Sequence, residues 1–193
     1  MSEPTVDAGT LAGAYLALAQ LFSYPNPEAW KRLTENGLVD PEISAADLEA
    51  EYLAAFEVGR EKSPVPLFEG MHRGDLGRDG ILEDLLRFYE FFDVKLSETD
   101  REYPDHLVTE LEFVAWLCMQ EHAAEQKGGD ALPYRRAARD FLDRHLGAWL
   151  PNFRKRLEAT ETAYAQYGTT LAELVETHRG RLGNELQESG DTP

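Results

Sequence analysis

The sequence predicts an all-α protein, a single globular bundle of about eight to ten helices. Three observations support this fold class. Nearly every long segment repeats its apolar residues at helical spacing, and no run of about four to eight residues alternates β-branched and polar side chains as a strand would. The chain has 193 residues, 42% of them hydrophobic, which is enough for a proper core. We expect one domain over residues 1–193, with disordered tails at 1–7 and 188–193.

The N-terminal part of the chain predicts three helices. In residues 8–22 apolar side chains cover the helix almost all round, beginning with Leu11 and Tyr15. Prolines end this helix and open a short second one over residues 27–36. A serine in a capping-box-like start opens the third, over residues 44–59.

Residues 60–80 break the helical pattern. Pro64 and Pro66 lie close together, and a glycine-rich run extends from Gly74 to Gly80. We expect an irregular loop of about twenty residues here. Loops of that length are uncommon in compact domains unless they have a function.

Two helices are expected after this loop, over residues 81–92 and 104–126. The second begins at Pro104 and carries apolar side chains on most of its sides. A helix of that kind is normally the central one of a bundle. We therefore expect Leu111 and Trp116 to be almost wholly buried.

The C-terminal part predicts a helix over residues 131–147 and a last one over about residues 161–182. Acidic and basic residues four positions apart stabilise the first of these, for example Asp140 with Arg144. Gly147 and Pro151 are expected to interrupt the chain after it.

The chain is strongly acidic, with 36 acidic and 19 basic side chains and a net charge of −17. This argues against binding to nucleic acid or to anionic lipid, because both need clustered Lys and Arg. It suits a cationic partner. No segment reaches the roughly 18 apolar residues of a membrane span, and the apolar stretch at residues 11–22 lacks the basic residues that precede the core of a signal peptide. We expect a cytoplasmic protein.

Catalytic and metal-binding motifs find little support. The single cysteine, Cys118, excludes an internal disulfide and a cysteine-rich metal site. Glu69 and His72 have the spacing of a di-iron motif, but only one copy is present. The segment 75–86 resembles a calcium loop that lacks two essential ligands, and the five histidines are dispersed. We therefore expect no metal, no cofactor and no enzymatic activity.

One cluster remains, at residues 103–107 together with Glu110. In the structural interpretation Asp105 starts a helix and His106 is a partly buried side chain bound by a neighbour. In the functional interpretation His106 and Glu110 share a helix face with Asp105 beside them, and the carboxylates accept hydrogen bonds from a partner's guanidinium groups. The residues alone favour the structural interpretation and leave the functional one open.

Residues 103–113, Tyr-Pro-Asp-His-Leu-Val-Thr-Glu-Leu-Glu-Phe, resemble the signature of the TorD/DmsD/NarJ family of redox-enzyme maturation chaperones. Four weaker matches accompany this signature, and together the matches span about residues 10–125. They are the helix from Tyr15 to Phe22 running into Ser23-Tyr24-Pro25, the pattern Tyr52, Phe56 and Gly59, the stretch from Pro64 to Glu69, and the stretch from Leu85 to Tyr89.

The resemblance implies a TorD-like cytoplasmic chaperone. Such a protein binds the twin-arginine leader and the unassembled body of a molybdenum oxidoreductase catalytic subunit, holds it until the cofactor is inserted, and delays its export. The Phe-Glu-Gly after the prolines resembles the subgroup that serves enzymes of the dimethylsulfide, ethylbenzene and selenate type. The client-binding residues that the resemblance implies are Pro104, Asp105, His106 and Glu110, with Phe68 and Glu69 in second place.

A twin-arginine leader joins two arginines to an apolar stretch, so we expect a groove with an acidic rim and an apolar floor. Two alternatives stay open. One is a small enzyme that uses Asp105 and His106 as an acid–base pair, and the other is a permanent structural subunit of an oxidoreductase complex. The chain is expected to be a monomer or a homodimer.

Overall fold

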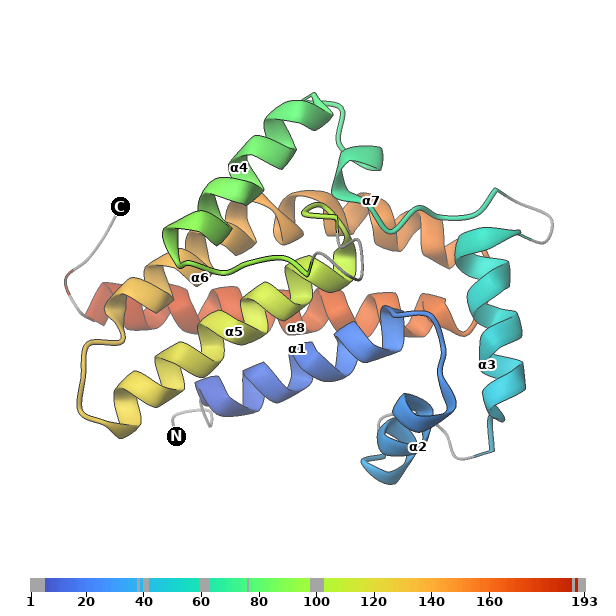
Figure 1. Ribbon diagram of the computed structural model, residues 1–193, viewed down its shortest axis with the longest axis horizontal. Coiled ribbons are helices and arrows are strands. Elements are labelled where there is room, and N and C mark those ends of the chain that lie inside the picture. The colour runs from blue at the N-terminus through green and yellow to red at the C-terminus, as the bar shows by residue number, and fades with distance from the viewer. Residues whose placement is uncertain are drawn as a thin grey trace.

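The computed structural model describes residues 6–37, 39, 42–59, 63–75, 77–97, 103–188 and 190 (Figure 1). Over these residues the chain forms eight α-helices and no β-sheet, which confirms the predicted all-α class. The helices are α1 (Ala8–Phe22), α2 (Pro27–Glu35), α3 (Ala45–Tyr52), α4 (Arg78–Phe91), α5 (Leu107–Gln126), α6 (Leu132–Arg144), α7 (Leu146–Glu158) and α8 (Tyr164–Glu188). A π-helical turn, Leu53–Glu57, continues α3, and a 3-10 turn, Glu69–Met71, precedes α4.

Helix α5 lies at the centre of the bundle, as predicted. It packs against α1 and α6, while α8 packs against α7, α6 and α1. Helices α1, α5 and α8 follow the long axis of the molecule, and α4 lies across one side of them (Figure 1). One cluster of buried apolar side chains joins α1 to α8 and includes Leu111, whose side chain is fully buried.

Trp116 is only partly buried, so the prediction for this residue was wrong. Its ring contacts Phe92 and Tyr134 on one side. It belongs to a strip of α5 that includes the exposed residues Glu112 and Met119, four before it and three after it. Since α1 and α6 cover the other faces of α5, this strip remains at the surface.

Side-chain caps explain where the first three helices begin. Asp7 Oδ1 accepts a hydrogen bond from Thr10 N at 3.0 Å at the start of α1. Asn26 caps α2, and Ser44 Oγ accepts from Asp47 N at 3.1 Å at the start of α3. Each bond satisfies a backbone N–H that has no partner within the helix. The predicted disordered tails fall mostly outside the described residues, but Asp7 is part of the capped start and α8 extends to residue 188.

Pro151 lies inside α7 and does not end a helix, contrary to the prediction. Proline cannot donate the backbone hydrogen bond at its position. The helix is nevertheless retained because its apolar face is almost completely buried, with Trp149 and Phe153 at 0% exposure. Burial of such large side chains stabilises by about 1.5–3 kcal/mol each, enough to offset one lost bond.

The predicted helix at 104–126 begins three residues later, at Leu107. Residues 103–106 form a turn in which His106 N donates to Tyr103 O at 3.1 Å. The predicted loop at 60–80 is also shorter than expected, because α4 begins at Arg78. Within the described ranges no helix is both long and apolar enough to cross a membrane.

Candidate functional site

The turn before α5 pairs with the chain segment before α4. Glu69 N donates to Asp105 O at 2.9 Å, and Leu107 N donates to Leu67 O at 2.8 Å. Phe68 and His106 thus form an antiparallel β-bridge. The structure therefore brings together two parts of the predicted site that are about 37 positions apart in the sequence.

Aromatic side chains cover this bridge. The Phe68 ring lies edge-on to the rings of Tyr103 and His106, with centroid distances of 5.7 and 5.0 Å. Tyr103 is exposed, and Phe68 and His106 are partly exposed. Tyr89 Oη donates to the carbonyl of Pro104 at 2.9 Å, which holds the turn against α4. The predicted site thus presents an aromatic surface.

His106 is the N-cap residue of α5. Its Nδ1 accepts a hydrogen bond from Val108 N at 3.2 Å, and this requires an unprotonated Nδ1. Burial lowers the pKa of His106, although the charge of Asp105 acts in the opposite direction. The side chain is therefore neutral and holds the start of the helix, as the structural interpretation of the sequence expected.

The Asp105 carboxylate is fully buried and faces Arg78. Arg78 Nε lies 3.3 Å from Asp105 Oδ2, and Nη2 lies 3.5 Å from Oδ1. The same guanidinium group lies over the Phe68 ring, 5.7 Å from its centroid, and is half-exposed. Gly70 allows this close approach, because a Cβ there would lie 3.2 Å from Asp105 Oδ2 and 2.9 Å from Arg78 Cγ.

Glu69 is fully buried and has a partner on each oxygen. Its Oε1 accepts from Arg73 Nη1 at 2.7 Å, and its Oε2 lies 2.9 Å from Nδ1 of His145. Buried carboxylates persist when they are paired in this way. No sequence pattern predicts the pairing with His145, which lies 76 residues further along the chain.

Glu110 is fully buried next to this pair. Its Oε2 accepts from Trp149 Nε1 at 3.1 Å, and its Oε1 has no hydrogen-bond partner among the described residues. Burial, followed by the negative charge of Glu69, raises the pKa of Glu110 well above its usual value. Burial therefore favours the protonated form of this carboxyl group.

The three carboxyl groups of the predicted site thus lie beneath the surface. Asp105, Glu69 and Glu110 all have 0% exposure, and each has a partner within the chain. They do not form the rim of a groove. Phe68, Pro104 and His106 are the predicted residues that reach the surface, each of them in part.

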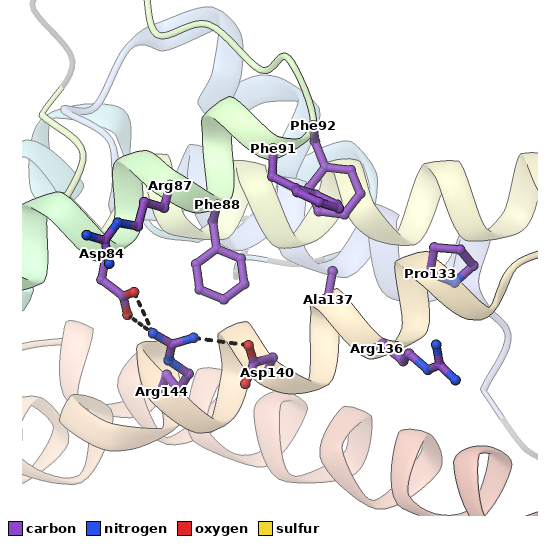
Figure 2. Close-up of a pocket in the computed structure, with 10 residues that line it drawn as sticks. All are labelled: Asp84, Arg87, Phe88, Phe91, Phe92, Pro133, Arg136, Ala137, Asp140 and Arg144. Carbon is purple, nitrogen blue, oxygen red and sulfur yellow. Dashed lines mark hydrogen bonds and ion pairs between the residues drawn. The ribbon is translucent and has the colours of Figure 1, made fainter. Parts of the chain in front are cut away.

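A groove lies nearby, between α4 and α6, with a volume of about 620 Å³ (Figure 2). Phe88, Phe91 and Phe92 provide apolar surface along it. Its complete lining is Asp84, Arg87, Phe88, Phe91, Phe92, Pro133, Arg136, Ala137, Asp140 and Arg144. The floor is apolar as expected, but the rim carries arginines as well as aspartates.

The buried carboxylates are linked to one end of this groove. His145, which binds Glu69 through Nδ1, has its Nε2 3.2 Å from Asp84 Oδ2. Arg73, which binds the other oxygen of Glu69, donates from Nη1 to the carbonyl of Arg144 at 2.6 Å. From the sequence, Arg144 was predicted only to stabilise its own helix and Asp84 was not singled out, because their proximity depends on how α4 packs on α6. No group of three potential metal ligands occurs in the described part of the chain.

The profile of the nitrate reductase delta subunit family matches residues 19–155. The chain belongs to this family. A selenate reductase assembly chaperone protein from Thauera selenatis is 70% identical over 94% of this chain and 94% of its own length. A chlorate reductase assembly chaperone protein from Ideonella dechloratans is 67% identical over 93% of each chain.

A solved structure supports the fold. It is a putative redox enzyme maturation protein from Archaeoglobus fulgidus, with a TM-score of 0.58, 20% identity, and coverage of 86% of this chain and 93% of that one. The family match over residues 19–155 confirms the resemblance to the TorD/DmsD/NarJ family, and the solved structure supports the fold. The named relatives are chaperones and not enzymes, which confirms the prediction that the chain is not an enzyme. The acid–base alternative finds no support, because Asp105 and His106 are bound by Arg78 and the α5 backbone.

Proposed function

We propose that this member of the nitrate reductase delta subunit family is an assembly chaperone for the catalytic subunit of a molybdenum oxidoreductase. The observation that carries the proposal is the 70% identity to a selenate reductase assembly chaperone along almost the whole of both chains. Identity at that level extends over the surface as well as the core. A client of the selenate or chlorate reductase type is the first to test.

The client is bound before assembly, in the cytoplasm, through its twin-arginine leader and through the body of the apo subunit. Retention of the leader delays export until the cofactor is in place. The net charge of −17 supports this part of the proposal, because it favours association with a cationic segment. The adjoining aromatic surface and apolar groove offer contacts for the apolar part of the leader.

The predicted residues have different places in this proposal. Phe68, Pro104 and His106 lie where a bound segment reaches them. Asp105, Glu69 and Glu110 lie beneath this surface. Asp105 holds Arg78 on Phe68, Glu69 joins the turn before α4 to His145, and Glu110 joins α5 to Trp149. Phe68, Pro104 and His106 are the proposed contact residues, and the three buried carboxyl groups support the elements that carry them.

Co-expression tests the chaperone proposal. The catalytic subunit of a selenate- or chlorate-type reductase is produced in cells with and without this chain, and cofactor content and activity are measured. We expect cofactor-loaded enzyme to accumulate only when the chain is present. Equal amounts of loaded enzyme in both cultures would contradict the proposal.

Calorimetry with synthetic leader peptides tests leader binding. A twin-arginine leader is expected to bind more tightly than its twin-lysine version, because guanidinium offers a planar fork to a carboxylate and ammonium is a compact point charge. Equal affinity for the two peptides would show that the arginines are not recognised.

A further inference from the structure

Arg144 occupies the polar end of the α4–α6 groove, between two carboxylates (Figure 2). We propose that an arginine of the client's leader binds Asp84 and Asp140 there, in place of Arg144. The apolar residues that follow this arginine then cover the phenyl rings of the groove. The inference rests on the proposed function. It places the site that binds the leader's arginine in the α4–α6 groove, outside the motif at residues 103–113.

The contacts of Arg144 define what the site recognises. Its Nη2 lies 2.5 Å from both Oδ1 and Oδ2 of Asp84, and its Nη1 donates to Asp140 Oδ2 at 3.1 Å. Its Cζ also lies 5.3 Å from the centroid of the Phe88 ring. A guanidinium group is therefore bound through two carboxylates and an aromatic face, which together match its charge, its fork of donors and its planar shape.

Arg144 is held loosely enough to be exchanged. Its side chain is 47% exposed and that of Asp140 is 56% exposed. Ion pairs at such exposed positions contribute only about 0–1 kcal/mol. Asp84 is more buried than Asp140, at 21% exposure, and its Oδ2 lies 3.2 Å from His145 Nε2. An incoming arginine makes the same contacts, and its apolar neighbours add buried surface.

The apolar part of the groove lies beside this polar end. Phe91 is 80% exposed, and Phe88 and Phe92 are partly exposed. Large exposed apolar side chains grouped around a groove mark a binding surface. From Asp84 to Phe92 the helix rises roughly 12 Å. That length accommodates about four extended or eight helical residues after the bound arginine.

The other arginines of the lining do not block a cationic segment. Arg87 Nη2 binds Glu83 at 2.6 Å on the same helix. Arg136 extends away from the three phenyl rings (Figure 2). The two carboxylates at the polar end therefore face Arg144, and its removal leaves both of them open to a partner's cation.

The test measures leader affinity by calorimetry with the full chain. Arg144→Gln removes the competing guanidinium and is expected to tighten binding of the twin-arginine leader roughly threefold to tenfold. Asp140→Asn is expected to weaken it roughly fivefold or more, and Asp84→Asn by at least as much. Arg139→Gln is the matched control, since Arg139 lies on the same helix and pairs with Asp143, away from the groove lining. It is expected to leave the affinity unchanged.

The gain in Arg144→Gln should shrink with the twin-lysine leader, because the single nitrogen of lysine cannot reach Asp84 and Asp140 through two separate donor groups as a guanidinium does. Circular dichroism and thermal melting confirm that each variant is folded, and Asp140, which is exposed, tests the site even if Asp84→Asn is unstable. The proposal is overturned if Arg144→Gln leaves the affinity for the leader unchanged. It is also overturned if the substitution weakens binding, because Arg144 would then itself contact an acidic residue of the client. If the client subunit co-purifies while its leader does not bind, this site is wrong and the chaperone proposal stands. If neither binds, the proposed function fails.

Discussion

At the scale of single residues, Glu110 is a carboxyl group whose burial favours the uncharged form. Burial raises its pKa well above the usual 4.5. The folded chain therefore binds this proton more tightly than the unfolded chain does. Its contribution to stability is complete below the unfolded pKa and is lost as the pH rises through the folded pKa.

Glu110→Gln is expected to remove this loss of stability at higher pH. The amide is neutral at every pH, and its oxygen still accepts from Trp149 Nε1. Urea unfolding at several pH values from 5 to 9 should show similar stability near pH 5 and a growing advantage of the variant above it, by up to about 1.4 kcal/mol per pH unit. A constant difference across that range would mean that Glu110 is already ionised in the fold.

Substitutions at His106 and Leu111 distinguish the effect of helix capping on stability from the effect of core packing. His106→Ala removes the N-cap acceptor of α5 and is expected to lower stability by about 0.5–2 kcal/mol. Leu111→Ala opens a cavity in the centre of the bundle and should lower it by about 2–5 kcal/mol. Both are measured by urea unfolding. If the two variants lose the same stability, His106 is a core residue and not a cap at the edge of a surface.

The sequence predicts which acidic residues matter near α5, but not their environment. Asp105 and Glu110 stand out because they lie beside a helix start. Their burial depends on Arg78, which lies 27 residues away from Asp105, and on Trp149, which lies 39 residues away from Glu110. Helical periodicity describes one helix at a time and carries no information about such partners.

At the scale of elements, the close contact between the 3-10 turn before α4 and the turn before α5 depends on Gly70. A Cβ at this position would lie 2.9 Å from Arg78 Cγ, so Gly70→Ala must shift Arg78 or the turn. We expect a loss of about 1–3 kcal/mol in urea unfolding. Gly74→Ala is the control, because a Cβ there meets no atom within 4 Å, and it should be neutral or slightly stabilising. Equal effects of the two substitutions would contradict the tight contact.

The starts of helices were predictable from the sequence where the capping residue and the spacing of apolar residues agree. They were less predictable near proline. The starts of α1, α2 and α3 follow from local side-chain caps that the sequence displays. Pro104 precedes α5 by three residues because His106 takes the cap, and Pro151 is tolerated because α7 buries a continuous apolar face. Both outcomes depend on tertiary packing, which overrides the local preference of proline.

At the scale of the whole molecule, the net charge of −17 acts over distance and the groove acts by contact. Salt screens the attraction between an acidic protein and a cationic leader. It does not weaken the burial of apolar surface. Raising the salt concentration in calorimetry from about 0.05 to 0.5 M is therefore expected to weaken leader binding only partly. Complete loss of binding would contradict an apolar contribution from the groove.

The central claim is that this chain binds a reductase before assembly. It is tested most directly by identifying which form of the reductase the chain binds in cells. The chain is captured from the cytosol of cells that contain the client, and the bound catalytic subunit is analysed for its leader and its cofactor. The account predicts the precursor, with its leader intact and no cofactor. Capture of only the mature, cofactor-loaded enzyme would instead show a permanent subunit, and would contradict an assembly chaperone.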